Sequence, residues 1–418
     1  MRNLNASRPA RFRPGLIAAI VLPLLILLWA WYELWVAYTI TPAVQKNYGG
    51  ILREVAESWQ DTSGSNGWDA LMEASRLLED HNDKFLYTDD TIHSLDEIGI
   101  AAQLQLLSQS SYALMPIPDS EAGKPLNIML MSSSTRRLGQ CLRARMQLAR
   151  ENKDWDAYLE SYGWLIEISR ALAYQPGTMN PMIATMILSL GIEQVIEDVQ
   201  HGVLPDDVVL ALGDSTDRLP TAAQIRRVYD AERYVQLDIF QQLYGPGGRL
   251  ILTEYAKLVP FAEEEPWIKN VQGRWKPGWD HCERQIHAYQ DEVGRILDVS
   301  LAEREPMRPE ARTRGLAQRF ADPQPDDEPL PMFDPTKSFA ERFLDTDVAF
   351  SLADQELRHA LLCEGVTLLL AIERYRIQSG EYPSVLDELV PDYIYTVPID
   401  PCSPDARPWV YRKHEEPD

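Results

Sequence analysis

Apolar residues recur at three- and four-residue spacing along most of the 418-residue chain, which is the pattern of amphipathic α-helices. The first clear segments are residues 42–60 and 67–82, and the turn-forming sequence DTSGSNG separates them. Residues 92–118 continue in the same way and end among prolines. The pattern therefore predicts a mainly α-helical body that opens with these helical segments.

The clearest helical unit lies at residues 134–176. Its spacing predicts one helix to about Glu151, a short turn at NKDW, and a second helix to about Tyr174 that Pro176 stops. The unit resembles the helix-turn-helix of tetratricopeptide-type repeats at Leu138, Gly139, Ala149, Ala157, Tyr158, Ala171 and Pro176. Such repeats are normally stacked in groups of about three or more, and the sequence holds one copy in good form. We therefore expect a helical hairpin inside a larger helical domain, with a repeat array as the alternative.

The segment MIATMILSLGI, residues 182–192, is apolar on all sides. It is too short for a membrane span, which takes about 20 residues, and the charged sequence EQVIEDVQ follows at once. These features predict a buried central helix. Such a helix would offer no acid, base or metal ligand to a site in the middle of the domain.

The amino-terminal segment has a different pattern. Residues 1–14 are basic and contain no acid, and residues 16–32 form an uncharged, mostly apolar run. Continued past Glu33 to Ile40, the run reaches the roughly 20 residues that span a hydrocarbon core. Pro23 is tolerated there because neighbouring groups can satisfy the freed carbonyl. The far end carries an interfacial aromatic belt, formed by Trp29, Trp31, Tyr32, Trp35 and Tyr38.

Positive charge before the apolar run orients the chain in the membrane. We expect a cytoplasmic tail at residues 1–14, a transmembrane signal-anchor helix at 15–38 and an extracytoplasmic helical body at 39–302. This arrangement places the protein in the inner (cytoplasmic) membrane with a single span. The alternative is a cleaved signal peptide ending at Ala43, but the apolar stretch is longer than usual and no A-x-A site follows it.

Acidic residues dominate the chain after this segment. The formal net charge is −23 although the first 38 residues hold four arginines and one acid. Such a surface repels phosphate backbones, so no nucleic-acid partner is expected. The four cysteines lack C-x-x-C spacing and form no disulfide framework. In an oxidising compartment the sequence allows one or two disulfides. We interpret Cys141 and Cys363 as small core residues because they lie in helical patterns.

A proline-rich stretch divides the body from the end of the chain. Seven prolines between Pro306 and Pro335 predict a linker at residues 303–336. Residues 337–418 then predict a long helix and a small α+β module. The helix ends at Gly380, a residue suited to the left-handed helix stop. A short helix near residues 384–390 and a strand, turn and strand at 392–413 follow, which predicts a β-hairpin.

The last 50 or so residues resemble the carboxyl-terminal region of type II secretion pseudopilins. The matching residues are Tyr375, Gly380, Tyr382, Pro383, Leu386, Leu389, Pro391, Tyr393, Val397, Pro398, Asp400, Pro401 and Tyr411. The chain also resembles membrane-anchored proteins of planctomycete-type bacteria in which a helical body precedes this motif. It departs from the prepilin pattern because Ile20 stands where a prepilin has glutamate, and because the motif lies far from the membrane helix. The resemblance thus implies an interaction module and not a filament subunit.

The same resemblance implies a calcium site in the loop near Asp400. Asp400 and Asp405 are the candidate ligands, but calcium prefers six to eight oxygen atoms and only these two acids are close by. The alternative is that Asp400 stabilises the turn before Pro401. We therefore predict no metal site here and keep both residues as weak candidates.

No sequence motif for a common catalytic site is present. The cluster HCERQIH offers Glu283 and His287 on one helix face, but a metal site would need further ligands. The acids Asp206 and Asp207 fit a helix amino terminus, the run at 263–265 fits a solvated loop, and GPGGRL fits a turn. Trp267, Trp275 and Trp279 suit either core packing or binding of a sugar or partner.

These observations favour a membrane-anchored extracytoplasmic scaffold with envelope proteins as partners and no cofactor, linked to a secretion or pilus-like assembly. The alternative is an envelope hydrolase whose active site is built from dispersed Asp, Glu and His residues of the body.

Overall fold

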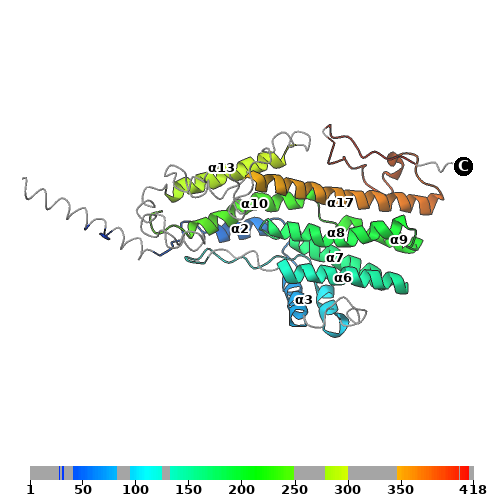
Figure 1. Ribbon diagram of the computed structural model, residues 1–418, viewed down its shortest axis with the longest axis horizontal. Helices are drawn as coiled ribbons and strands as arrows, with labels where there is room; N and C mark the ends of the chain where they lie inside the picture. Colours follow the sequence, from blue (N-terminus) through cyan, green and yellow to red (C-terminus); the bar gives the residue numbers. More distant parts are fainter. Residues whose placement is uncertain are drawn as a thin grey trace, which may run out of the picture.

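The computed structural model describes residues 28, 31–32, 41–81, 95–124, 132–248, 278–299, 346–403 and 405–413. Within these ranges the regular structure is helical, and Figure 1 shows an elongated arrangement of packed helices. The α-helices are α2 (Tyr48–Glu57), α3 (Trp68–Asp80), α5 (Ile100–Ser108), α6 (Ser132–Asn152), α7 (Trp155–Ala173), α8 (Met179–Gln200), α9 (Asp206–Asp214), α10 (Ala222–Gln241), α13 (Trp279–Leu297) and α17 (Thr346–Ser379). Two short 3₁₀ helices, η2 (Thr216–Arg218) and η5 (Leu386–Leu389), complete the described elements.

The predicted helical hairpin is confirmed as α6 and α7. Lys153 adopts a left-handed φ of 60° between them, and the Asp154 side chain caps α7 by accepting the Ala157 N–H at 3.1 Å. The pair packs against α8, and α3 and α5 cover it on one side. α7 ends at Ala173, just before Pro176.

The apolar segment 182–192 lies inside α8, as predicted for a central helix. Ala184, Ile187, Leu188 and Ile192 are fully buried, and α8 contacts α6, α7 and α17. The main core therefore joins helices from both ends of the chain. Its α17 members are Cys363, Val366 and Leu370.

A second layer is built from α2, α10 and α13. Tyr48 of α2 packs with Tyr244 and Trp279 at the carboxyl-terminal end of α10 and the start of α13. Farther along, the end of α13 packs against the amino-terminal half of α10 and the first turns of α17. This layer therefore runs lengthwise from the first described helix of the body to α17 (Figure 1).

Residues 380–413, here called the tail, fold back on the carboxyl-terminal half of α17. The apolar residues at this contact are Leu368, Ala371, Leu386, Leu389 and Ile394. Gly380 has a φ of 83°, which confirms it as the left-handed stop of α17. The tail is thus packed on a helix that also contributes to the main core.

The predicted β-hairpin is absent from the described part of the tail. The two segments meet at one isolated antiparallel bridge between Ile399 and Pro408. Asp400 donates its N–H to the Arg407 carbonyl at 2.8 Å, and Trp409 donates to the Pro398 carbonyl at 3.2 Å. Pro398 and Pro408 lack N–H donors, so a longer ladder of hydrogen bonds cannot form here.

Two other predictions concern residues that the structure leaves largely undescribed. In the part that it describes, no helix combines the length and the apolar character needed to cross a membrane. The expected span at 15–38 lies outside this part except for Leu28, Trp31 and Tyr32, which are helical and exposed. The predicted linker at 303–336 lies wholly outside it.

Candidate functional site

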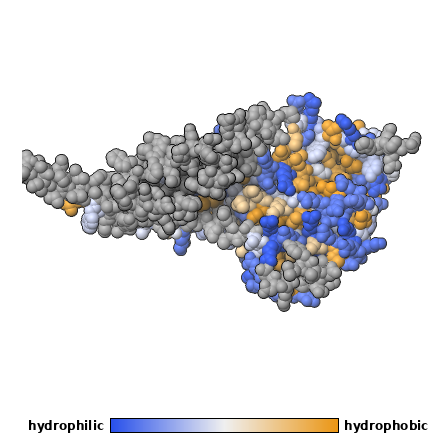
Figure 2. All heavy atoms as spheres, in the orientation of Figure 1, coloured by the Kyte–Doolittle hydropathy of each residue, from blue (hydrophilic) through white to orange (hydrophobic). Residues whose placement is uncertain are grey.

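Large apolar side chains are exposed on the tail. Apart from the three in the expected span, nine large apolar residues stand out as exposed in the described chain, and five of these belong to the tail. They are Tyr382 (40% exposed), Val385 (52%), Tyr395 (82%), Ile399 (54%) and Val410 (78%). Figure 2 shows apolar residues gathered over the tail and the carboxyl-terminal half of α17. Such a concentration is typical of a surface that binds a partner.

Side chains alternate between two faces along the last described segment. Trp409 and Tyr411 point inward and pack with the α17 cluster, whereas Pro408 and Val410 are exposed. Ile399 lies across the bridge from Pro408 and therefore on the same side as Val410. We call Ile399, Pro408 and Val410 the outer face of the tail.

Polar contacts fix the tail on α17. Trp409 Nε1 donates to Glu364 Oε2 at 3.1 Å, and the Tyr393 hydroxyl donates to Gln378 Oε1 at 2.8 Å. Burial raises the pKa of Glu364, the Trp409 hydrogen bond opposes this shift, and the Asp400 charge adds to it. These bonds hold the inward-facing side of the tail against α17, while the outer face points to solvent.

The two calcium candidates have local partners. Asp400 Oδ1 accepts the Cys402 N–H at 2.8 Å, which is a turn-stabilising bond, and Asp405 pairs with Arg407 at 2.7 Å. No group of three or more His, Cys, Asp or Glu residues that could hold a metal ion is found among the described residues. The alternative role proposed for Asp400, turn stabilisation, matches the bond it makes.

Glu283 belongs to α13 and faces α2. It accepts a hydrogen bond from the Tyr48 hydroxyl at 2.6 Å, and burial together with this carboxylate raises the pKa of Tyr48. His287 lies one turn farther along α13 and is partly exposed, and Cys282 is buried against the aromatic cluster. Trp279 is buried as well, which confirms the core interpretation for this tryptophan.

The centre of the domain does contain an acid, contrary to the expectation from residues 182–192. α8 continues to Gln200 and buries Asp198 almost completely. Three groups donate hydrogen bonds to this carboxylate: Arg150 Nη1 at 2.7 Å, the Tyr158 hydroxyl at 2.9 Å and Gln194 Nε2 at 3.1 Å. The signal in the sequence was the position of Asp198, which continues the three- and four-residue spacing of the buried α8 residues.

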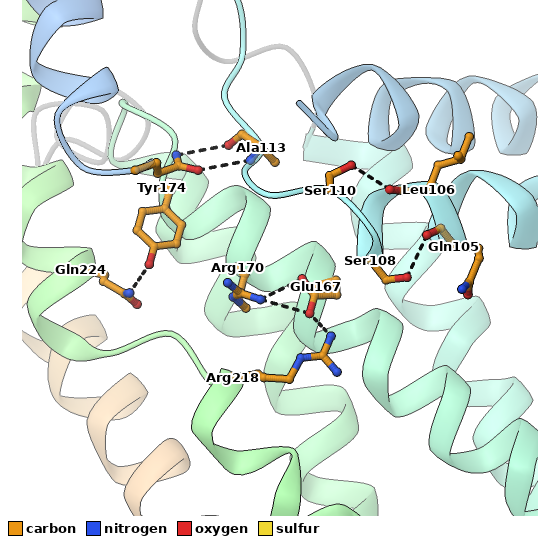
Figure 3. Close-up of polar contacts among 11 residues, drawn as sticks. Gln105, Leu106, Ser108, Ser110, Ala113, Glu167, Arg170, Tyr174, Arg218 and Gln224 are labelled. Carbon is orange, nitrogen blue, oxygen red and sulfur yellow. Dashed lines mark hydrogen bonds and ion pairs between the residues drawn. The ribbon is translucent and has the colours of Figure 1, made fainter. Parts of the chain in front are cut away.

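A second partly enclosed acid joins α7 to η2. Figure 3 shows Arg170 and Arg218 converging on Glu167, and Arg170 Nη1 lies 3.1 Å from its Oε2. The same view shows Gln224 of α10 bonded to the Tyr174 hydroxyl at the end of α7. Both contacts tie α7 to the chain that follows α9, so these polar groups serve the packing of helices.

Glu232 on α10 is an acid with a strongly raised pKa. Burial raises the pKa of its carboxyl group to about 7, although Oε2 accepts the Thr178 N–H at 2.8 Å. A carboxyl group that titrates near neutral pH can act as a general acid or base. No local pattern marks this residue, because its hydrogen-bond partner, Thr178, comes from the loop before α8.

His359 and Cys363 of α17 form a buried pair near Thr185. The His359 Nε2 lies 2.7 Å from the Pro220 carbonyl, and Nδ1 lies 3.1 Å from Thr185 Oγ1. Burial lowers the pKa of His359 and raises that of Cys363 to about 12. The ring is therefore neutral and the thiol protonated at neutral pH, which does not suit a nucleophilic pair.

Comparison of the chain with protein-family models, with curated proteins and with solved structures gives no match.

Proposed function

We propose that the protein is a membrane-anchored extracytoplasmic scaffold that binds envelope proteins through the tail. The observation that carries this proposal is the outer face, where Ile399 and Val410 are 54% and 78% exposed on an anchored backbone. The resemblance of the tail to pseudopilins favours a secretion or pilus-like assembly as the process. The amino-terminal apolar segment supports the anchor.

Burial of the apolar side chains of the outer face would stabilise a complex with a partner. Complete burial of a valine or isoleucine side chain contributes about 1.5–3 kcal/mol relative to leaving it exposed. Two such side chains on one face therefore offer a partner several kcal/mol before the costs of association. Because the inner side chains already pack on α17, binding requires little reordering of the tail.

The test is affinity capture of the full-length protein from gently solubilised native membranes. The variant Ile399→Ser, Val410→Ser removes the apolar outer face and leaves the inward residues unchanged. The control is Leu106→Ser, Val203→Ser, which changes residues that are 52% and 44% exposed on other parts of the body. We expect the outer-face variant to lose specific partners that wild type and the control retain. Equal capture by all three proteins would show that the tail is not the binding surface.

An envelope hydrolase is the second candidate function, and Glu232 is the observation that favours it. Its pKa of about 7 suits general acid-base chemistry in the body. Screening the full-length protein and Glu232→Gln against ester, peptide and glycoside substrates tests this candidate. Activity that Glu232→Gln abolishes, with an unchanged circular dichroism spectrum, would favour the enzyme over the scaffold.

A further inference from the structure

The chain that follows the proposed membrane span is bonded to the end of α10. Ala43 donates its N–H to the Tyr244 carbonyl at 3.0 Å, and Gln45 Nε2 donates to the Gly245 carbonyl at 2.9 Å. Gln241 Oε1 accepts the backbone N–H groups of Gln45 and Lys46 at 3.0 and 3.1 Å. We call this set of contacts the clamp. It joins residues almost 200 positions apart and fixes where the chain enters the body.

The residues behind the clamp are buried and tightly packed. Gln241 Nε2 donates to Asp238 Oδ1 at 2.8 Å, and both side chains are fully buried. Tyr48 follows the clamp directly, with its ring 6.0 Å from that of Trp279, which lies 5.4 Å from the Tyr244 ring. The clamp therefore holds a defined end of the body, and not a loose loop.

This end of the body must lie close to the membrane if residues 15–38 span it. Ala43 lies five positions after residue 38. An extended chain covers at most about 3.6 Å per residue, so the distance cannot exceed about 18 Å.

Two helices then lead away from the clamp. α13 begins at Trp279 in the aromatic cluster and ends at Leu297, which packs in one cluster with Leu352 of α17. At 1.5 Å per residue this length of α13 covers about 27 Å. The tail packs on α17 from Glu364, which accepts the Trp409 hydrogen bond, to Tyr375, and this adds about 18–35 Å from Leu352. Figure 1 shows α13 and α17 following one another along the longest axis, with the tail at the far end.

Contacts with α9 brace the distal part of α17. Arg374 Nη2 lies 3.0 Å from Asp214 Oδ1, and Arg376 Nη2 lies 3.5 Å from Asp206 Oδ1. Val366 and Leu370 are fully buried in the main core. The helix that carries the tail is therefore fixed along its length and cannot swing back toward the clamp without breaking the core.

We infer that α13 and α17 form a spacer that holds the tail roughly 45–60 Å from the clamp, at the end of the body farthest from the membrane. The partner of the outer face is then an extracytoplasmic protein domain, and not the lipid surface or a membrane-spanning helix. This inference rests on the proposed function, because it takes the membrane anchor as given.

The cysteines of the chain provide a direct test. Cys402 in the tail is exposed, whereas Cys141, Cys282 and Cys363 are buried. The full-length protein, labelled with a donor fluorophore at Cys402, is reconstituted into liposomes that carry acceptor-labelled headgroups, with a dye pair of short Förster distance. The matched variant, Val44→Cys in a Cys402→Ser background, places the same donor beside the clamp. We expect strong energy transfer from position 44 and weak transfer from position 402.

Each other outcome rejects a different part of the argument. Strong transfer from both positions would overturn the spacer and leave the anchor intact. Weak transfer from both would show that the clamp is not near lipid, which refutes the anchor and with it the proposed function. Weak transfer from position 44 with strong transfer from 402 would reverse the orientation of the body and overturn the inference.

Discussion

Substitution of Gly49 by alanine tests the packing of α2 against the loop at residues 118–120. A Cβ atom added at Gly49 would lie 2.2 Å from the Pro118 carbonyl oxygen and 3.0 Å from the Ser120 nitrogen. Ordinary contacts of a Cβ atom begin at 3.4 Å, so the loop or the helix must retreat by more than an ångström. Both contacting atoms belong to backbone, which cannot rotate away as a flexible side chain can.

The expected loss of stability is about 2–4 kcal/mol. Overpacking costs about 1–3 kcal/mol. The retreat also lengthens the bonds from Gly49 N–H to Ser120 Oγ and from Ser120 N–H to Asn47 Oδ1, both 2.9 Å, and each is worth about 1 kcal/mol. The higher helix propensity of alanine offsets at most about 1 kcal/mol of this loss of stability.

The assay is urea unfolding of the full-length protein in mild detergent, followed by circular dichroism. The matched control is Gly163→Ala in α7, where an added Cβ meets no atom within 4 Å. This control should raise the free energy of unfolding by about 0.5–1 kcal/mol through helix propensity alone. A Gly49→Ala protein as stable as wild type would refute the close approach of α2 and Pro118.

Two further predictions concern the acids Glu232 and Asp198. Burial raises the pKa of Glu232 from 4.5 to about 7. Between these pH values the folded state holds a proton that the unfolded state releases. The free energy of unfolding therefore falls as pH rises from 4.5 to 7. Glu232→Gln should therefore match wild type below pH 4.5 and gain up to about 3 kcal/mol by pH 8 in urea titrations, and a gain independent of pH would contradict this reasoning. For the Asp198 network, Tyr158→Phe should cost about 1–2 kcal/mol and Asp198→Ala about 3–5 kcal/mol, because the latter leaves Arg150 and the Tyr158 hydroxyl without their acceptor. In a double-mutant cycle, Tyr158→Phe should cost almost nothing in the Asp198→Ala background, and full additivity would argue against the contact.

Local signals in the sequence are enough to predict some elements of the fold. The hairpin of α6 and α7 followed from apolar spacing, a turn at Lys153 and Asp154, and a stop at Pro176. Local signals suffice because a helix is closed by bonds between residues four apart and is ended by residues that cannot make those bonds. The β-hairpin predicted for the tail is wrong because Pro398 and Pro408 have no N–H groups to extend the hydrogen bonding beyond the single bridge at Ile399 and Pro408.

Which residues meet across the fold follows from the packing of the helices and cannot be predicted from local patterns. Asp198 is an ordinary acid in the sequence, and the packing of α6 and α7 on α8 surrounds it with Arg150 and Tyr158. The sequence alone also does not show which side chains form the outer face of the tail. Residues 408–411 are all apolar or aromatic in the sequence. The contact with α17 selects Trp409 and Tyr411 as the inner side and leaves Val410 outside. These choices depend on contacts between distant residues, which no local pattern specifies.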